Sequence, residues 1–144
     1  MNLAIKRLLF PTIVLILASF PVKAQESSIN YLYPEDFYHS FRSEHYALIV
    51  DTRKANHFRK ERINGAVNVK NMKSLVAFAD TLDREIPIYL YCDGVSRSLT
   101  VADYLVGKGF VKIIILSGGI REWKERMMDM ESVRQKRRPG PYPV

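Results

Sequence analysis

The sequence has little cysteine and little histidine, and these shortages exclude several kinds of site. Its 144 residues contain one cysteine, Cys92, and three histidines. A single cysteine can form neither an intramolecular disulfide nor a Cys-x-x-Cys redox pair. The histidines, His39, His45 and His57, have no metal-ligand spacing with one another or with Cys92. We therefore expect no metal centre in this protein.

The excess of basic residues lies at the two ends of the chain. There are 22 Lys and Arg residues against 15 Asp and Glu residues. Three basic residues lie within residues 1–24 and four within 134–144, which leaves 15 basic and 15 acidic residues in 25–131. This central segment has no net charge and no interleaving of basic and aromatic residues. We therefore expect no nucleic-acid partner.

The first 24 residues have the order of basic, apolar and small residues that is typical of a cleaved secretory signal peptide. Two basic residues precede an apolar stretch over residues 8–20, and small residues follow at Val22 and Ala24. The stretch is short for a membrane span, although an uncleaved N-terminal anchor is the alternative. The sequence predicts a periplasmic or secreted protein that begins at Gln25 and has no stable membrane span after cleavage.

Short uninterrupted apolar runs predict a parallel β-sheet. The strongest runs cover residues 47–50, 86–91 and 112–116, and weaker ones at 29–32 and 66–69 complete five expected strands. Runs without polar alternation are typical of strands that are buried on both faces, as in parallel sheets.

Helical patterns separate these runs. Pro34 suits the first position of a helix. Apolar residues recur at helical spacing in four sets: Phe37 and Phe41; Leu75, Phe78 and Leu82; Leu99, Ala102 and Val106; and Ile120, Trp123, Met127 and Met130. We predict an α/β domain over residues 25–131, with a five-stranded parallel sheet flanked by helices. Residues 132–144 are basic and rich in proline, and we predict a flexible tail there.

Cys92 directly follows the strand expected at 86–91, and a helix is expected to begin near Ser98. Ligand sites in parallel sheets gather at the carboxyl ends of the strands. Backbone N–H groups of the loop and the helix N-terminus would favour negative charge there, so the thiol should ionise readily. The pattern predicts a nucleophilic thiolate, and a buried structural cysteine is the alternative. The anion-binding loop would comprise Asp93, Gly94, Val95, Ser96, Arg97 and Ser98.

Three ordered motifs resemble those of the rhodanese-like domains, which are single-domain sulfurtransferases. They are "LIVDTRKANHFRKERINGAVNVK", "YCDGVSRS" and "GFVKIIILSGGIREW". The matching residues are Asp51, Arg53, Phe58, Ile63, Gly65, Ala66, Asn68, Gly118, Gly119 and Trp123. The resemblance implies that Cys92 takes sulfane sulfur from a donor such as thiosulfate or a persulfide, holds it as a persulfide, and passes it to a thiol or to cyanide. It implies no metal and no organic cofactor.

The cysteine loop departs from the family pattern. Gly94 comes one residue earlier than the usual loop glycine, and Asp93 is acidic where many members are basic or neutral. These departures leave the donor open, and they leave open a binding or sensing module with little turnover. Related phosphatases and arsenate reductases have one residue more between cysteine and arginine than the four between Cys92 and Arg97, which favours sulfur transfer. Asp51 and Arg53 either brace the loop or form a structural ion pair.

Overall fold

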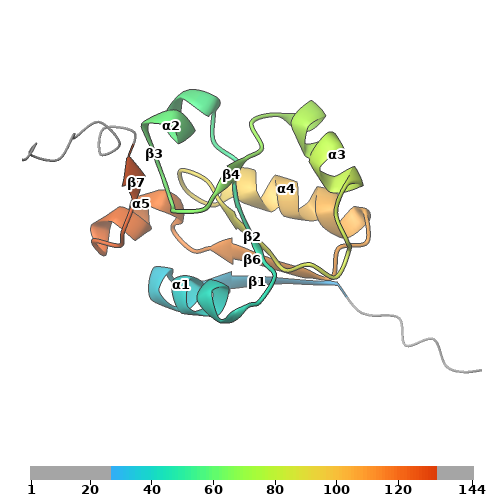
Figure 1. Ribbon diagram of the computed structural model, residues 1–144, viewed down its shortest axis with the longest axis horizontal. Coiled ribbons are helices and arrows are strands. Elements are labelled where there is room, and N and C mark those ends of the chain that lie inside the picture. Colours follow the sequence, from blue (N-terminus) through green and yellow to red (C-terminus); the bar gives the residue numbers. More distant parts are fainter. Residues whose placement is uncertain (1–26, 133–144) are drawn as a thin grey trace, which may run out of the picture.

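A five-stranded parallel sheet lies at the centre of the protein, as the apolar runs predict (Figure 1). The computed structural model describes residues 27–132, so the expected signal peptide lies outside the described residues. The strands of the sheet are β1 (Ser28–Leu32), β2 (Leu48–Asp51), β4 (Val67–Asn68), β5 (Ile88–Tyr91) and β6 (Lys112–Leu116). All pairs are parallel, and the order β1-β6-β5-β2-β4 places β5 in the middle. The predicted α/β architecture is confirmed.

Helices cover both faces of the sheet (Figure 1). One core contains buried residues of α3 (Met72–Asp80) and α4 (Ser96–Gly107), and the other contains those of α1 (Pro34–Ser43) and α5 (Gly119–Glu125). The short helix α2 (Ala55–Lys60) follows β2 and buries none of its residues.

Strand β5 contributes to both cores. Ile88 and Leu90 belong to the core beneath α3 and α4, and Tyr89 and Tyr91 belong to the core beneath α1 and α5. Successive side chains of a strand point to opposite faces, so a strand covered on both sides is apolar at every position. This explains the uninterrupted run that precedes Cys92.

Helix α1 begins at Pro34, as predicted, with Glu35 and Asp36 in its first turn. These acidic side chains suit the positive end of the helix dipole. The helix is anchored by Phe37, whose ring packs edge to face against Tyr89, with 5.2 Å between ring centroids. Phe37 packs in the same way against Trp123 of α5, at 6.2 Å.

Two predicted apolar stripes need correction. Helix α4 starts at Ser96 and buries Val101, Ala102 and Leu105, whereas Leu99 is exposed. Apolar residues occur on two faces of this helix, so periodicity alone could not decide which face is inside. The other correction concerns Met127, which comes after the end of α5.

Helix α5 ends at Glu125, and Met127 takes a left-handed conformation with φ 54° and is 92% exposed. The predicted stripe is therefore right at Ile120 and Trp123 but wrong at Met127. Met130, which belonged to the predicted stripe, and Met128, which did not, pack against the core beyond the end of the helix.

A small antiparallel ribbon joins β3 (Glu61–Arg62) to β7 (Glu131–Ser132). This ribbon could not be predicted from the sequence, because two-residue strands have no periodicity. An ion pair between Arg62 and Glu131 connects its strands. Strand β7 includes Ser132, the first residue of the expected tail, and residues 133–144 lie outside the described residues.

Candidate active site

The site is built at the carboxyl ends of β2 and β5. Cys92 directly follows β5, residues 93–95 form a bend, and α4 begins at Ser96. The predicted loop is therefore shorter than expected, since Ser96, Arg97 and Ser98 form the first turn of α4. Cys92 is buried, with 4% of its surface exposed.

The polar residues of the cysteine loop and of the first turn of α4 have different surroundings. Asp93 is exposed, and its carboxylate lies 3.5 Å from Nδ1 of His57 on α2. Arg97 donates from Nη1 to the carbonyl of Thr52 at 3.2 Å, which ties α4 to the end of β2. Ser98 is fully buried, and its Oγ has no hydrogen-bond partner within residues 27–132.

Asp51 and Arg53 form a buried ion pair at the end of β2. The Arg53 Nη2 to Asp51 Oδ2 distance is 2.8 Å, and the side chains are 2% and 0% exposed. Burial alone would lower the pKa of Arg53, but the hydrogen bonds and charge of Asp51 outweigh it and raise this pKa above its ordinary value. Arg53 also donates to the carbonyl of Glu61 at 2.7 Å. Its guanidinium lies 5.6 Å from the ring of Tyr91, the residue before Cys92. The pair is thus an ion pair within the fold that also contacts the base of the cysteine loop.

The start of α5 packs directly against the cysteine loop. The N–H of Ile120 donates to the carbonyl of Cys92 at 2.9 Å. Gly119 has φ +63°, and a Cβ there would lie 2.2 Å from the carbonyl oxygen of Gly94 and 2.6 Å from that of Cys92. No residue with a side chain fits this approach. The motif contains Gly119, but the sequence alone does not show what the glycine contacts.

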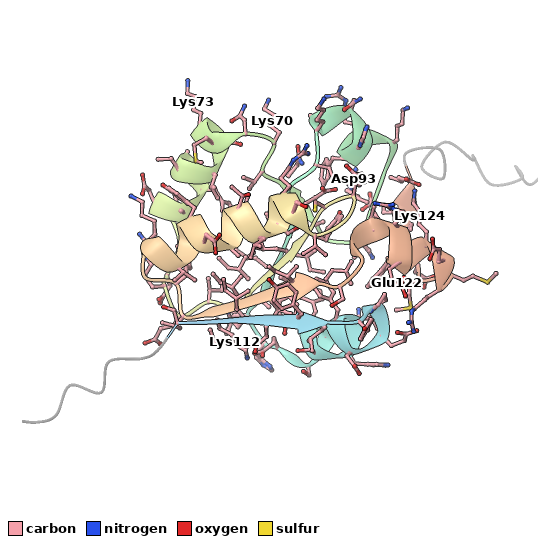
Figure 2. All side chains as sticks on the ribbon, turned by 180° about the vertical axis from the view of Figure 1, so that it is seen from behind. Lys70, Lys73, Asp93, Lys112, Glu122 and Lys124 are labelled. Atoms are coloured by element: carbon pink, nitrogen blue, oxygen red, sulfur yellow. The ribbon has the colours of Figure 1, made fainter. Side chains whose placement is uncertain are left out.

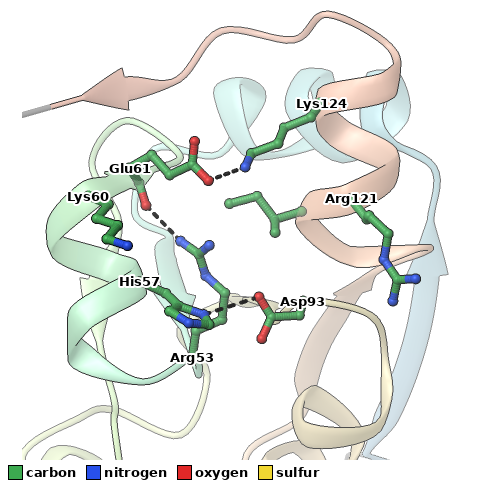
Figure 3. Close-up of a pocket in the computed structure, with 8 residues that line it drawn as sticks. Arg53, His57, Lys60, Glu61, Asp93, Arg121 and Lys124 are labelled. Carbon is green, nitrogen blue, oxygen red and sulfur yellow. Dashed lines mark hydrogen bonds and ion pairs between the residues drawn. The ribbon is translucent and has the colours of Figure 1, made fainter.

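A cavity of about 330 Å³ lies between α2, α5 and the cysteine loop. Figure 3 shows Lys60 and His57 on its α2 side, Arg121 and Lys124 on its α5 side, and Arg53 and Asp93 between them. Lys124 is paired with Glu61 of β3. Asp93 and Lys124 lie at the same end of the molecule, away from Lys112 at the start of β6 (Figure 2).

The sequence did not predict a role for Lys60 or Arg121. Arg121 is near the cysteine loop, because a Cβ on Gly94 would lie 3.5 Å from its Nη2. That approach joins residues 27 positions apart, and only the packing of α5 against the loop brings them together. A second cavity, of about 230 Å³, lies between the starts of α3 and α4 and includes Arg97, Lys70 and Met72 in its lining.

These features place the protein in a class of α/β domains that carry a thiol at the carboxyl end of the central strand. The chain belongs to the family of rhodanese-like domains, whose family model matches residues 33–126. Within residues 27–132, no helix has the length and apolar character that a membrane span requires. The same residues contain no cluster of three or more His, Cys, Asp or Glu side chains that could hold a metal ion.

Curated relatives include thiosulfate sulfurtransferases named GlpE. The protein from Coxiella burnetii is 32% identical over 77 residues, which cover 54% of this chain and 71% of the relative. The protein from Actinobacillus succinogenes is 28% identical over 99 residues, which cover 69% of this chain and 87% of the relative.

Solved structures with the same fold include the rhodanese-like domain of an Anabaena protein. Its TM-score is 0.65 at 20% identity, and the match covers 79% of this chain and 87% of that domain. The thiosulfate sulfurtransferase of Pseudomonas aeruginosa has a TM-score of 0.63 at 20% identity, and the match covers 72% of this chain and 20% of that enzyme. At these identities the structures establish the fold, which is the rhodanese-like α/β fold.

Proposed function

We propose that the protein is a sulfurtransferase in which Cys92 carries sulfane sulfur as a persulfide. The observation that carries the proposal is the position of Cys92, at the carboxyl end of the central strand and before the first turn of α4. The N-terminus of a helix attracts negative charge, which a thiolate and a persulfide both carry. The relationship to GlpE supports thiosulfate as one donor.

The transfer proceeds in two displacements. The Cys92 thiolate attacks the outer sulfur of thiosulfate, a bond forms between Sγ and that sulfur, and sulfite leaves with the electron pair of the broken S–S bond. Cyanide or a thiolate then attacks the outer sulfur of the Cys92 persulfide. Thiocyanate or a new persulfide forms, and the Cys92 thiolate is released.

The surroundings of Cys92 suit the stabilisation of a small sulfur anion. Preorganised donors that face a developing charge lower the barrier of such a reaction. Residues 93–95 lead directly into the first turn of α4, whose leading N–H groups have no partner within the helix. The unpartnered hydroxyl of Ser98 is a further donor within this turn. The four-residue spacing from Cys92 to Arg97 favours sulfur over a tetrahedral phosphate.

Intact mass measurement after incubation with thiosulfate tests the proposal. We expect a mass gain of one sulfur atom, and because Cys92 is the only cysteine the adduct is assigned without peptide mapping. Thiocyanate should appear when cyanide is added, and folded Cys92→Ser should produce none. If no sulfane donor yields the adduct, the domain is a binding or sensing module. Turnover of an aryl phosphate through Cys92 would instead indicate a phosphatase.

We also propose that the protein acts after export. The order of residue types in residues 1–24 supports this, and strand β1 begins only at Ser28, so cleavage after Ala24 would leave the sheet intact. N-terminal sequencing of the protein from the producing cells should begin at Gln25. Recovery of a form that still carries Met1 in the membrane fraction would contradict the proposal.

A further inference from the structure

We propose that the cavity beside the cysteine loop binds the carboxylate groups of an organic persulfide donor through Arg121 and Lys60. The inference rests on the sulfurtransferase function proposed above and names its substrate class. In the transfer, the Cys92 thiolate attacks the outer sulfur of R–S–S⁻. The bond from Sγ to this sulfur forms, the S–S bond of the donor breaks, and R–S⁻ leaves with the electron pair.

The charges around the cavity leave two cations available. Arg53 is neutralised by Asp51, and Lys124 by Glu61. Lys60 and Arg121 line the same cavity, are exposed, and have no ion-pair partner within residues 27–132. They come from α2 and α5, on opposite sides of the cavity (Figure 3). Ammonium and guanidinium groups in such positions suit carboxylates.

The size of the cavity favours an organic molecule. Its volume of about 330 Å³ lies within the range of small-molecule sites. A water molecule in the liquid takes up about 30 Å³, so the cavity has room for about ten non-hydrogen atoms, such as the carboxylate-bearing end of a larger organic donor. Thiosulfate, with its five non-hydrogen atoms, would fill only about half of this space.

The position of Asp93 separates the two kinds of donor. The negative oxygens of thiosulfate lie within two bonds of the transferred sulfur, so they would be close to the Asp93 carboxylate next to Cys92. His57, at 3.5 Å from that carboxylate, offsets this charge only when it is protonated. The carboxylates of an organic persulfide are several bonds away from its outer sulfur. They can pair with Lys60 and with Arg121, which lies against Gly94 of the loop, and these two cations offset the charge of Asp93 in the same cavity lining.

The rate of sulfur loading onto Cys92 tests this specificity. The full chain would be mixed with one of three probes in single-turnover conditions: glutathione persulfide, 2-hydroxyethyl persulfide, which has no carboxylate, or thiosulfate. Intact mass would follow the one-sulfur adduct on Cys92. The variants are Arg121→Gln and Lys60→Gln. Arg126→Gln is the matched control, because Arg126 also lies on the α5 segment but pairs with Glu35 and Glu122 outside the cavity.

We expect Arg121→Gln to slow loading from glutathione persulfide about 5- to 10-fold, since charge-assisted hydrogen bonds to carboxylates are the stronger ones. Lys60→Gln should slow it less, and both variants should change loading from 2-hydroxyethyl persulfide less than about twofold. Arg126→Gln should leave all three rates unchanged.

Two results would overturn the inference. If both variants slow the two organic donors equally, the side chains support the loop and do not bind carboxylates. If thiosulfate loading falls as much as glutathione persulfide loading, the cavity serves the inorganic anion. Absence of any adduct in the unsubstituted protein would instead remove the sulfurtransferase function itself.

Discussion

Asp93 is the residue of the cysteine loop whose charge opposes the proposed chemistry. With about 6 Å between its carboxylate and the sulfur and an effective dielectric of about 40, the repulsion is roughly 1.4 kcal/mol before screening by salt. The neighbouring His57 reduces it when protonated. We therefore expect Asp93→Asn to raise the rate of loading by thiosulfate several-fold at low salt, with a smaller gain as salt is added.

Asp103→Asn, on the exposed side of α4, is the matched control and should not change the rate. An unchanged or lower rate in Asp93→Asn would show that the carboxylate shapes the loop rather than repelling the donor.

The buried Tyr91 should make the stability of the protein depend on pH in the alkaline range. Burial, with a further contribution from the charge of Asp51, raises the pKa of Tyr91 far above its ordinary value of 10.0. The unfolded chain ionises this tyrosine above pH 10, whereas the folded protein does not. Stability from this group is complete below about pH 10 and falls above it, by up to about 1.4 kcal/mol per pH unit.

Tyr91→Phe should remove this pH dependence but lower the stability of the protein at neutral pH. The variant leaves the N–H of Ile63 without the hydroxyl that accepts from it at 3.2 Å, which should cost about 1–3 kcal/mol. Free energies of unfolding in urea at pH 8 and pH 11 should show a smaller difference between variant and parent at the higher pH. A constant difference would contradict the assignment.

At the scale of elements, the end of α5 contains a strained residue. The N–H groups of Met127 and Met128 donate to the carbonyls of Lys124 and Trp123 at 2.9 and 3.1 Å. This is the Schellman arrangement, which usually has glycine where Met127 stands. Because a left-handed residue with a side chain costs about 1–2 kcal/mol, we expect Met127→Gly to raise the free energy of unfolding by about 1 kcal/mol.

Met72→Gly is the matched control, since Met72 is an exposed residue of the helix α3. It should lower the free energy of unfolding, by up to about 1 kcal/mol. If Met127→Gly destabilises the protein, the side chain of Met127 has a stabilising contact that outweighs its backbone strain.

The sequence predicts some elements and not others for identifiable reasons. Strands β2, β5 and β6 were predictable because their apolar runs mark burial, whereas the weaker runs of β1 and β4 belong to the two edge strands, which have no buried residue. Helix α2 was not, because "ANHFRK" has no apolar stripe and none of its residues is buried. The ribbon of β3 and β7 is too short to leave a pattern.

The site shows the same division. Cys92, Asp51 and Arg53 stand in motifs that can be read along the chain. The places of Lys60 and Arg121 at one cavity depend on how α2 and α5 pack around the loop, and no local pattern reports that packing.

At the scale of the whole molecule, the described core is complete without the last residues of the chain. Strand β7 ends at Ser132, and its partner β3 lies between α2 and β4 in the sequence. We therefore predict that deletion of residues 134–144 leaves the midpoint of thermal unfolding unchanged, as circular dichroism would measure. A fall of many degrees would show that the deleted residues pack on the domain.

Gly119, at the start of α5, packs directly against the backbone of the cysteine loop. It gives a way to sort related sequences that share the cysteine. A relative with a larger residue in place of Gly119 cannot keep the loop where it lies here, because the new side chain would occupy the space of two carbonyl oxygens. The presence of a cysteine therefore does not suffice to infer the same chemistry. A glycine at the position of Gly119 is an independent criterion to apply before a function is transferred from one sequence to another.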